Sequence, residues 1–127
     1  MMNDVKAVKK QVLATSKQWI ASFNNGDING CADAYRPNAV MDARPVGQFI
    51  GRKAILDFWQ QFVQSTGATD LVYKDVSIEV LDEHNAVLSA NWQMNVGRGY
   101  ISRELWQRQE SGQWLLGEDD FTVVEQF

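Results

Sequence analysis

The sequence predicts an α+β domain in which a curved antiparallel sheet wraps around three N-terminal helices. Apolar residues recur at helical spacing in the first half of the chain, and they alternate at every second position in the second half. Short turns separate the alternating segments, so neighbouring strands must run antiparallel. One face of such a sheet is apolar and needs cover, which the preceding helices can provide.

Three helices are expected in the first half. The first is long, ends at Gly26 and carries on one face Val5, Val8, Val12, Ser16, Trp19, Ile20 and Phe23. The second is short, begins after Asp27 and is expected to run through Tyr35, because Pro37 disfavours helical backbone in the residue before it. The third ends near Gly67, and its apolar stripe consists of Ile55, Phe58, Trp59, Phe62 and Val63.

Two short and four long strands are expected. The short strands span 39–42 and 46–50, and the long strands span 71–82, 86–96, 100–109 and 113–124. In the first long strand, the apolar residues at 72, 76, 78 and 80 are expected to share one face. Tight turns occupy the gaps between the long strands. The whole chain, 1–127, is long enough for a single domain with one core.

Composition and charge exclude several classes of protein. Hydrophobic residues make up 45% of the chain, which is typical of a globular protein. The formal net charge is −4 and the basic residues are scattered, so no nucleic-acid partner is expected. Cys31 is the only cysteine and is expected to be a small buried residue. No Cys/His cluster has metal-ligand spacing, so we expect no metal and no cofactor.

We expect a cytoplasmic protein without membrane contact. The N-terminal residues contain no apolar run behind a basic stretch, as a secretory signal would. No window of the chain approaches the roughly eighteen consecutive apolar residues of a membrane-spanning helix.

Three segments of the first half stand out by their order and spacing: Asn25-Gly26-Asp27, residues 35–40 and residues 51–59. Together with residues 106–114 and 119–121, they resemble the nuclear transport factor two-like superfamily, which includes the ketosteroid isomerases and the SnoaL-like polyketide cyclases. The resemblance implies a cystatin-like fold with one deep pocket for a small molecule. It also implies a homodimer that packs sheet to sheet.

Two carboxylates are candidate catalytic groups by this resemblance. Asp42 lies nine residues before Gly51, similar to the general-base aspartate of ketosteroid isomerases, which moves a proton between carbons. A strand-end aspartate bonded to its own backbone is the alternative. Glu104 lies eight residues before Gly112, where that family places a neutral acid that donates to an oxyanion. The alternatives are a salt bridge to Arg103 and a solvated sheet face.

Asp119 is the third candidate. Of Asp119 and Asp120, which follow Trp114 by five and six residues, one is expected to face the pocket. Pairing of Asp119 with an arginine would be similar to the Asp-Arg-Asp arrangement of the family's epoxide hydrolases, and a structural ion pair is the alternative. The arginines considered are Arg44, Arg98 and Arg103.

The expected pocket lining is largely aromatic and consists of Trp19, Phe23, Tyr35, Trp59, Trp92, Ser102 and Trp106. Trp19 stands where ketosteroid isomerases carry their oxyanion tyrosine, so steroid isomerase chemistry is not expected. His84 is the only histidine and is expected at the surface. This weakens the analogy to relatives that use a His-Asp pair, such as scytalone dehydratase.

Two functions remain open. The first is an isomerase, lyase or hydrolase that uses carboxylate acid–base chemistry on a small apolar carbonyl or hydroxylated compound. The second is a non-catalytic ligand-binding or dimeric interaction domain. Under both, a homodimer is expected through apolar residues on the outer sheet face: Val87, Ile101, Leu105 and Leu115.

Overall fold

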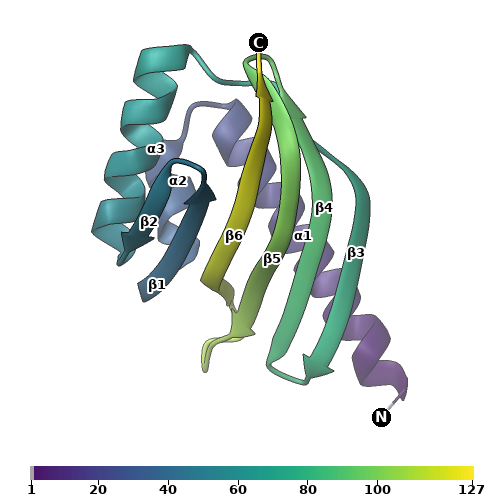
Figure 1. Ribbon diagram of the computed structural model, residues 1–127. Helices are drawn as coiled ribbons and strands as arrows, with labels where there is room; N and C mark the ends of the chain where they lie inside the picture. The colour runs from purple at the N-terminus through teal and green to yellow at the C-terminus, as the bar shows by residue number, and fades with distance from the viewer. Residues whose placement is uncertain (1) are drawn as a thin grey trace.

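The computed structural model describes residues 2–127, with side chains from Asp4 onward. The helices are α1 (Met2–Asn24), α2 (Ile28–Asp33) and α3 (Arg52–Thr66). The strands are β1 (Tyr35–Arg44), β2 (Gly47–Ile50), β3 (Val72–Asp82), β4 (Asn85–Met94), β5 (Gly97–Arg108) and β6 (Trp114–Gln126). They form one sheet in the order β2-β1-β6-β5-β4-β3, and it curves with the helices on one side (Figure 1). The predicted α+β class is confirmed.

The helices bury the faces that helical spacing predicts. In α1 the buried residues include Val12, Trp19 and Phe23, and the helix packs against β3 and β4. The third helix, α3, packs against β1 and β2 and ends at Gly67, whose left-handed backbone places its N–H 2.9 Å from the Val63 carbonyl oxygen. No helix in the described part of the chain has the length and apolar character needed to cross a membrane.

Strand β1 differs from the sequence-based expectation in two ways. It begins at Tyr35 and includes Pro37, where a helix end was predicted, because the buried Tyr35 side chain is anchored between the sheet and α3. Pairing between β1 and β6 is irregular from Tyr35 to Val40, so the missing N–H of Pro37 breaks no regular ladder. The β1 and β6 strands also run parallel, so the sheet is mixed and not purely antiparallel.

Two bulges decide which side chains of β5 and β6 face the helices. The extra residue is Ser102 in β5 and Gly117 in β6. Each shifts the alternation of inward and outward side chains by one position. Ile101 and Glu104 are therefore both buried although they lie three positions apart, and Asp119 is buried on the same face.

A bulge also changes the faces of β3. Asp75 has a left-handed backbone with φ of 55°, and the register with β4 shifts around it. Val72 and Val76 are consequently exposed, whereas Ile78 and Val80 pack against the core. The prediction that these four valine and isoleucine side chains share one face is wrong, because the bulge interrupts the alternation.

The outer face of the sheet retains three of the four apolar residues expected there. Val87, Leu105 and Leu115 are half-buried. Ile101 is instead buried on the inner face, because the bulge at Ser102 turns it inward. The homodimer stays a prediction, and size-exclusion chromatography of the purified protein tests it.

Gly99 is required where the Trp92 ring crosses β5. A Cβ atom at this position would overlap the Thr122 carbonyl oxygen and approach the Trp92 ring to 2.8 Å. We predict that Gly99→Ala lowers the free energy of unfolding by about 2 kcal/mol, as overpacking typically does. Chemical denaturation measures this change.

Gly117→Ala is the matched control, because the added methyl group there meets the flexible end of the Gln107 side chain. Equal losses of stability in the two variants would contradict the proposed role of Gly99.

Candidate active site

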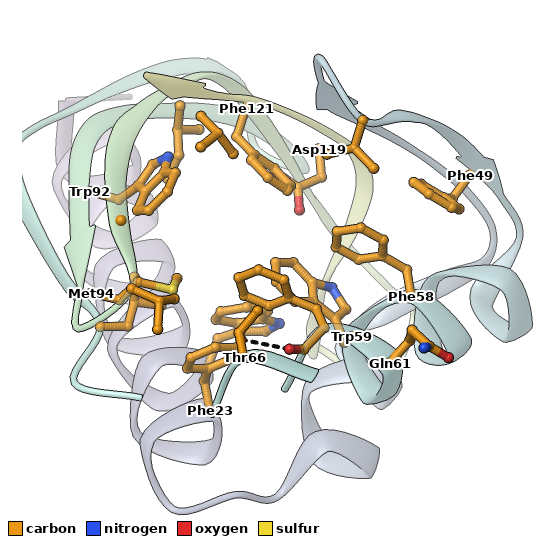
Figure 2. A pocket seen from close by; sticks show the side chains of 18 of the residues that line it. Phe23, Phe49, Phe58, Trp59, Gln61, Thr66, Trp92, Met94, Asp119 and Phe121 are labelled. Carbon is orange, nitrogen blue, oxygen red and sulfur yellow. Dashed lines mark hydrogen bonds between the residues drawn. The ribbon is translucent and has the colours of Figure 1, made fainter. Parts of the chain in front are cut away.

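A cavity of about 880 Å³ lies between the helices and the concave face of the sheet. Its wall is mostly aromatic, as Figure 2 shows, and includes Trp19, Phe23, Phe58, Trp59, Phe62, Trp92 and Phe121. The rings pack on one another: Trp59 stacks on Phe121 at 5.7 Å between ring centres. Exposed residues, such as Gln61 and Phe127, line the end of the cavity that meets solvent. The cavity is therefore suited to a largely apolar small molecule.

Two buried carboxylates interrupt this apolar wall. Glu104 on β5 and Asp119 on β6 are directly opposite each other in the strand pairing, and both line the cavity. Their exposed fractions are 3% and 6%. Charged residues are rarely buried to this degree without partners, so the arrangement requires hydrogen-bond donors.

Asp119 has one oxygen held by the protein and one that faces the cavity. Tyr35 donates its phenol hydrogen to Oδ2 of Asp119 at 2.7 Å. The indole N–H of Trp59 in turn donates to the Tyr35 hydroxyl at 3.3 Å. No described residue donates to Oδ1 of Asp119, and a carboxyl oxygen of this residue points into the open space in Figure 2. Asp119 is therefore the carboxylate that can contact a ligand directly.

Glu104 has both oxygens held. Tyr73 donates to Oε2 at 2.8 Å, and Trp106 donates its indole N–H to Oε1 at 3.0 Å. The side chain is therefore fixed in orientation, and any proton that it carries is shared with this network.

Burial keeps both carboxyl groups protonated to higher pH than usual. Burial and, to a lesser extent, the charge of Asp119 raise the pKa of Glu104 to about 8 against the opposing bonds from Tyr73 and Trp106. Burial likewise raises the pKa of Asp119 to about 7, although the Tyr35 hydrogen bond opposes the rise. At neutral pH the pair consequently holds between one and two protons, so a proton is available beside the ligand.

The phenols remain donors throughout this range. Burial, followed by the charge of Asp119, raises the pKa of Tyr35 well above its ordinary value. Burial and Glu104 do the same to the pKa of Tyr73.

The structure places Asp42 outside the cavity, which corrects the sequence-based expectation. In the parallel pairing with β6, Met41 lies beside Asp119, whereas Asp42 lies beside Asp120 on the opposite face. The Asp42 carboxylate accepts a hydrogen bond from the Gln48 amide at 3.0 Å. Alternation along β1 thus turns it away from the cavity, because its neighbour Met41 occupies the inward position.

The expected pocket lining falls into three groups. Trp19, Phe23, Trp59 and Trp92 line the cavity. Tyr35 and Trp106 are buried one layer behind its wall, where they donate to the carboxylates. Ser102 is exposed, because it is the extra residue of the β5 bulge.

Trp19 does not act as a donor into the cavity. Its indole N–H donates to the Cys31 carbonyl oxygen at 3.2 Å. Cys31 itself is fully buried, and burial raises the pKa of its thiol to about 12, so it is no nucleophile at neutral pH.

No arginine among the described residues pairs with Asp119. The three arginines considered for this role instead bind outward-facing or terminal carboxylates: Arg44 pairs with Asp120, Arg98 with Glu125 and Arg103 with Glu118. The Asp-Arg-Asp arrangement and the Arg103–Glu104 salt bridge are therefore both absent from the described part of the chain.

Tyr73 is the site residue that the sequence did not single out. It lies on β3 before the bulge at Asp75. Strict alternation along the whole strand therefore does not predict which side of the sheet its side chain faces, because the bulge interrupts the alternation. His84 is exposed in the turn after β3. Within residues 2–127, no group of three or more His, Cys, Asp or Glu side chains is arranged to hold a metal ion.

Comparison with known proteins identifies the fold and a domain family. The family model of the SnoaL-like domain matches residues 16–109. A candidate scytalone dehydratase from Novosphingobium aromaticivorans has a similar structure, with a TM-score of 0.85 and 11% sequence identity over 100% of this chain and 91% of its own. A comparison with curated proteins finds no match.

Two further solved structures have the same architecture. A ketosteroid isomerase-like protein from Erwinia carotovora atroseptica has a TM-score of 0.77 and 12% identity over 91% of this chain and 95% of its own. A protein with a cystatin-like fold from Nostoc punctiforme has a TM-score of 0.78 and 10% identity over 91% of this chain and 90% of its own. At these identities the similarity shows the fold alone.

The raised pKa values predict that the protein loses stability as the pH rises. In the unfolded chain these carboxyl groups ionise near pH 4, whereas in the folded protein they do so near pH 7 and 8. The folded state binds more protons between these limits, so the free energy of unfolding falls as pH rises from about 4 to 8, by about 1.4 kcal/mol per pH unit for each group that is protonated only in the folded state. Urea denaturation across this range measures the slope.

Glu104→Gln should flatten this slope, because it removes one of the two groups. Glu118→Gln, which removes an exposed carboxylate paired with Arg103, should keep it. A wild-type slope in Glu104→Gln would show that this group ionises normally in the folded protein.

Proposed function

Because this chain belongs to the SnoaL-like domain family and its cavity contains two buried carboxylates, we propose that it is an enzyme that moves protons within a small, largely apolar carbonyl or hydroxylated compound. One observation carries the proposal. Asp119 has one oxygen held by Tyr35 and the other directed into the cavity, beside a second carboxyl group that remains protonated at neutral pH. A positioned acid or base near neutral pKa is what general acid–base catalysis requires.

Asp119 is the group that exchanges protons with the substrate. As a carboxylate it takes a proton from carbon, and as an acid it returns that proton to a different position, which gives an isomerisation. With a hydroxylated substrate, Asp119 takes a carbon-bound proton and then gives it to the leaving hydroxyl, which gives water and an alkene. Glu104 keeps its proton while Asp119 is ionised, because neither carboxyl group readily ionises while the other is charged.

The choice among reaction classes rests on the partners of Asp119. Epoxide opening by an Asp-Arg-Asp arrangement is disfavoured, because no described arginine pairs with Asp119. Isomerisation and dehydration need a carboxyl pair alone, and both agree with the names of similar structures, a candidate dehydratase and an isomerase-like protein. A non-catalytic binding domain is the alternative that the following experiment separates.

Asp119→Asn should reduce proton exchange about 100-fold or more, the usual contribution of a positioned acid or base. The probe is 2-tetralone, an enolisable bicyclic ketone that the 880 Å³ cavity can contain. Exchange of its α-hydrogens for deuterium, followed by NMR, measures the rate with wild-type protein and each variant.

Asp42→Asn makes the same chemical change on the opposite face of the sheet and should leave the rate within about twofold. If wild-type protein binds 2-tetralone without accelerating exchange, the site is a binding site and the proposed activity is wrong. If Asp42→Asn abolishes exchange and Asp119→Asn does not, the assignment of the base is wrong.

Tyr35→Phe should move the pH midpoint of the exchange rate upward. The Tyr35 hydrogen bond lowers the pKa of Asp119, so its removal favours the protonated acid and a higher pH is needed to form the base. Tyr100→Phe, at an exposed position on β5, is the control and should leave the midpoint unchanged. A downward shift in Tyr35→Phe would contradict this arrangement of donor and base.

A further inference from the structure

The charged side chains that line the cavity in the described part of the chain are of one sign. The charged side chains among its described lining residues are all acidic: Asp57, Glu104 and Asp119. No lysine, arginine or histidine lines it in the described part of the chain. An anionic ligand would therefore be buried beside carboxylates without a compensating positive charge, which is strongly unfavourable in an apolar site.

The neutral hydrogen-bond donors around the carboxylates already have acceptors within the protein. Tyr35 donates to Asp119, and Tyr73 and Trp106 donate to Glu104. Trp59 donates to Tyr35. These groups therefore stabilise negative charge on the protein. Among the described buried donors only the Trp92 indole N–H, which also lines the cavity, has no partner, so a ligand meets one neutral N–H and no positive charge.

Aromatic rings line the open space toward which Asp119 points. Trp59 and Phe121 are stacked with 22° between their planes, and Phe58 meets Trp59 edge to face at 5.0 Å. Figure 2 shows these three rings and Asp119 around the same open space. Aromatic faces attract cations, most strongly where water is excluded. A carboxylate and several rings around one space thus provide complementary partners for one positive charge.

From these three observations we propose that the cavity binds protonated amines with an apolar ring body, with the ammonium group placed against Asp119 and the rings of Trp59 and Phe121. This proposal names a ligand class for the site and rests on the proposed function only in placing the ligand against Asp119. An amine of this kind acts as a substrate analogue or inhibitor that carries its own proton.

Binding of such a cation is coupled to proton release. The groups that face Asp119 are Tyr35 from β1, Glu104 from β5 and, through Glu104, Tyr73 from β3. Asp57 from α3 lines the cavity at an exposed position, and Asp120 lies on the other face of the sheet. The tyrosines stay neutral, so the carboxyl pair is the titrating unit. An ammonium group favours the ionised pair, so the pair should give up a proton to solvent when the amine binds.

Three probes with one bicyclic skeleton test the charge preference: 2-aminotetralin, 2-tetralol and tetralin-2-carboxylate. Isothermal titration calorimetry should show the amine binding at least about tenfold more tightly than the alcohol, with the carboxylate weakest. Repetition in buffers of different ionisation enthalpy should show release of a proton with the amine near neutral pH and none with the alcohol. The affinity for the amine should rise between about pH 6 and pH 8.5, as the pair ionises.

Asp119→Asn should remove the preference for the amine, and Glu118→Gln, an exposed change at the preceding residue of β6, should retain it. If Asp119→Asn does not fold, Glu104→Gln should reduce the preference and the proton release. Carboxylate binding as tight as that of the amine, or equal binding of amine and alcohol, would overturn the proposal.

The proposal and the proposed activity can fail separately. Amine preference without exchange of 2-tetralone hydrogens would leave the binding proposal intact and remove the activity. Exchange of 2-tetralone hydrogens without any preference among the three probes would leave the proposed activity intact and remove the binding proposal.

Discussion

Two carboxylates buried side by side on the concave face of the sheet are the constraint on which the rest of the site depends. An ionised or even neutral carboxyl group inside an apolar wall needs hydrogen-bond partners. Tyr73 and Trp106 supply them for Glu104, and Tyr35 supplies one for Asp119. These donors come from different strands, so the same pair ties β1, β3, β5 and β6 together.

The network extends from the sheet into the helices. Trp59 on α3 donates to the Tyr35 hydroxyl, and its ring stacks on Phe121 beside Asp119. The aromatic wall therefore does two things: it shields the two carboxyl groups from water, and it fixes the donor that holds Asp119. Exclusion of water raises the pKa of both carboxyl groups, which keeps a proton available beside a bound molecule.

Much of the fold was predictable because its signals are local. The helical spacing of Val12, Trp19 and Phe23 identified the buried face of α1, and Gly67 marked the end of α3. The assignment of Asp42 shows the limit of spacing as a guide to a site. Its distance from Gly51 matched a known catalytic position, but Met41 takes the inward place in β1, so Asp42 faces away from the cavity.

The sequence by itself determined the α+β class, the extent of the main elements and the aromatic character of the cavity, because periodicity and composition are read within a few residues. Only the tertiary structure decided which acids lie inside. The extra residues Ser102 and Gly117 each shift the alternation of their strands, and alternation alone does not reveal a bulge. The hydrogen bond that completes the site joins Tyr35 to Asp119 across 84 positions of the chain, a contact created when β1 and β6 pair in parallel.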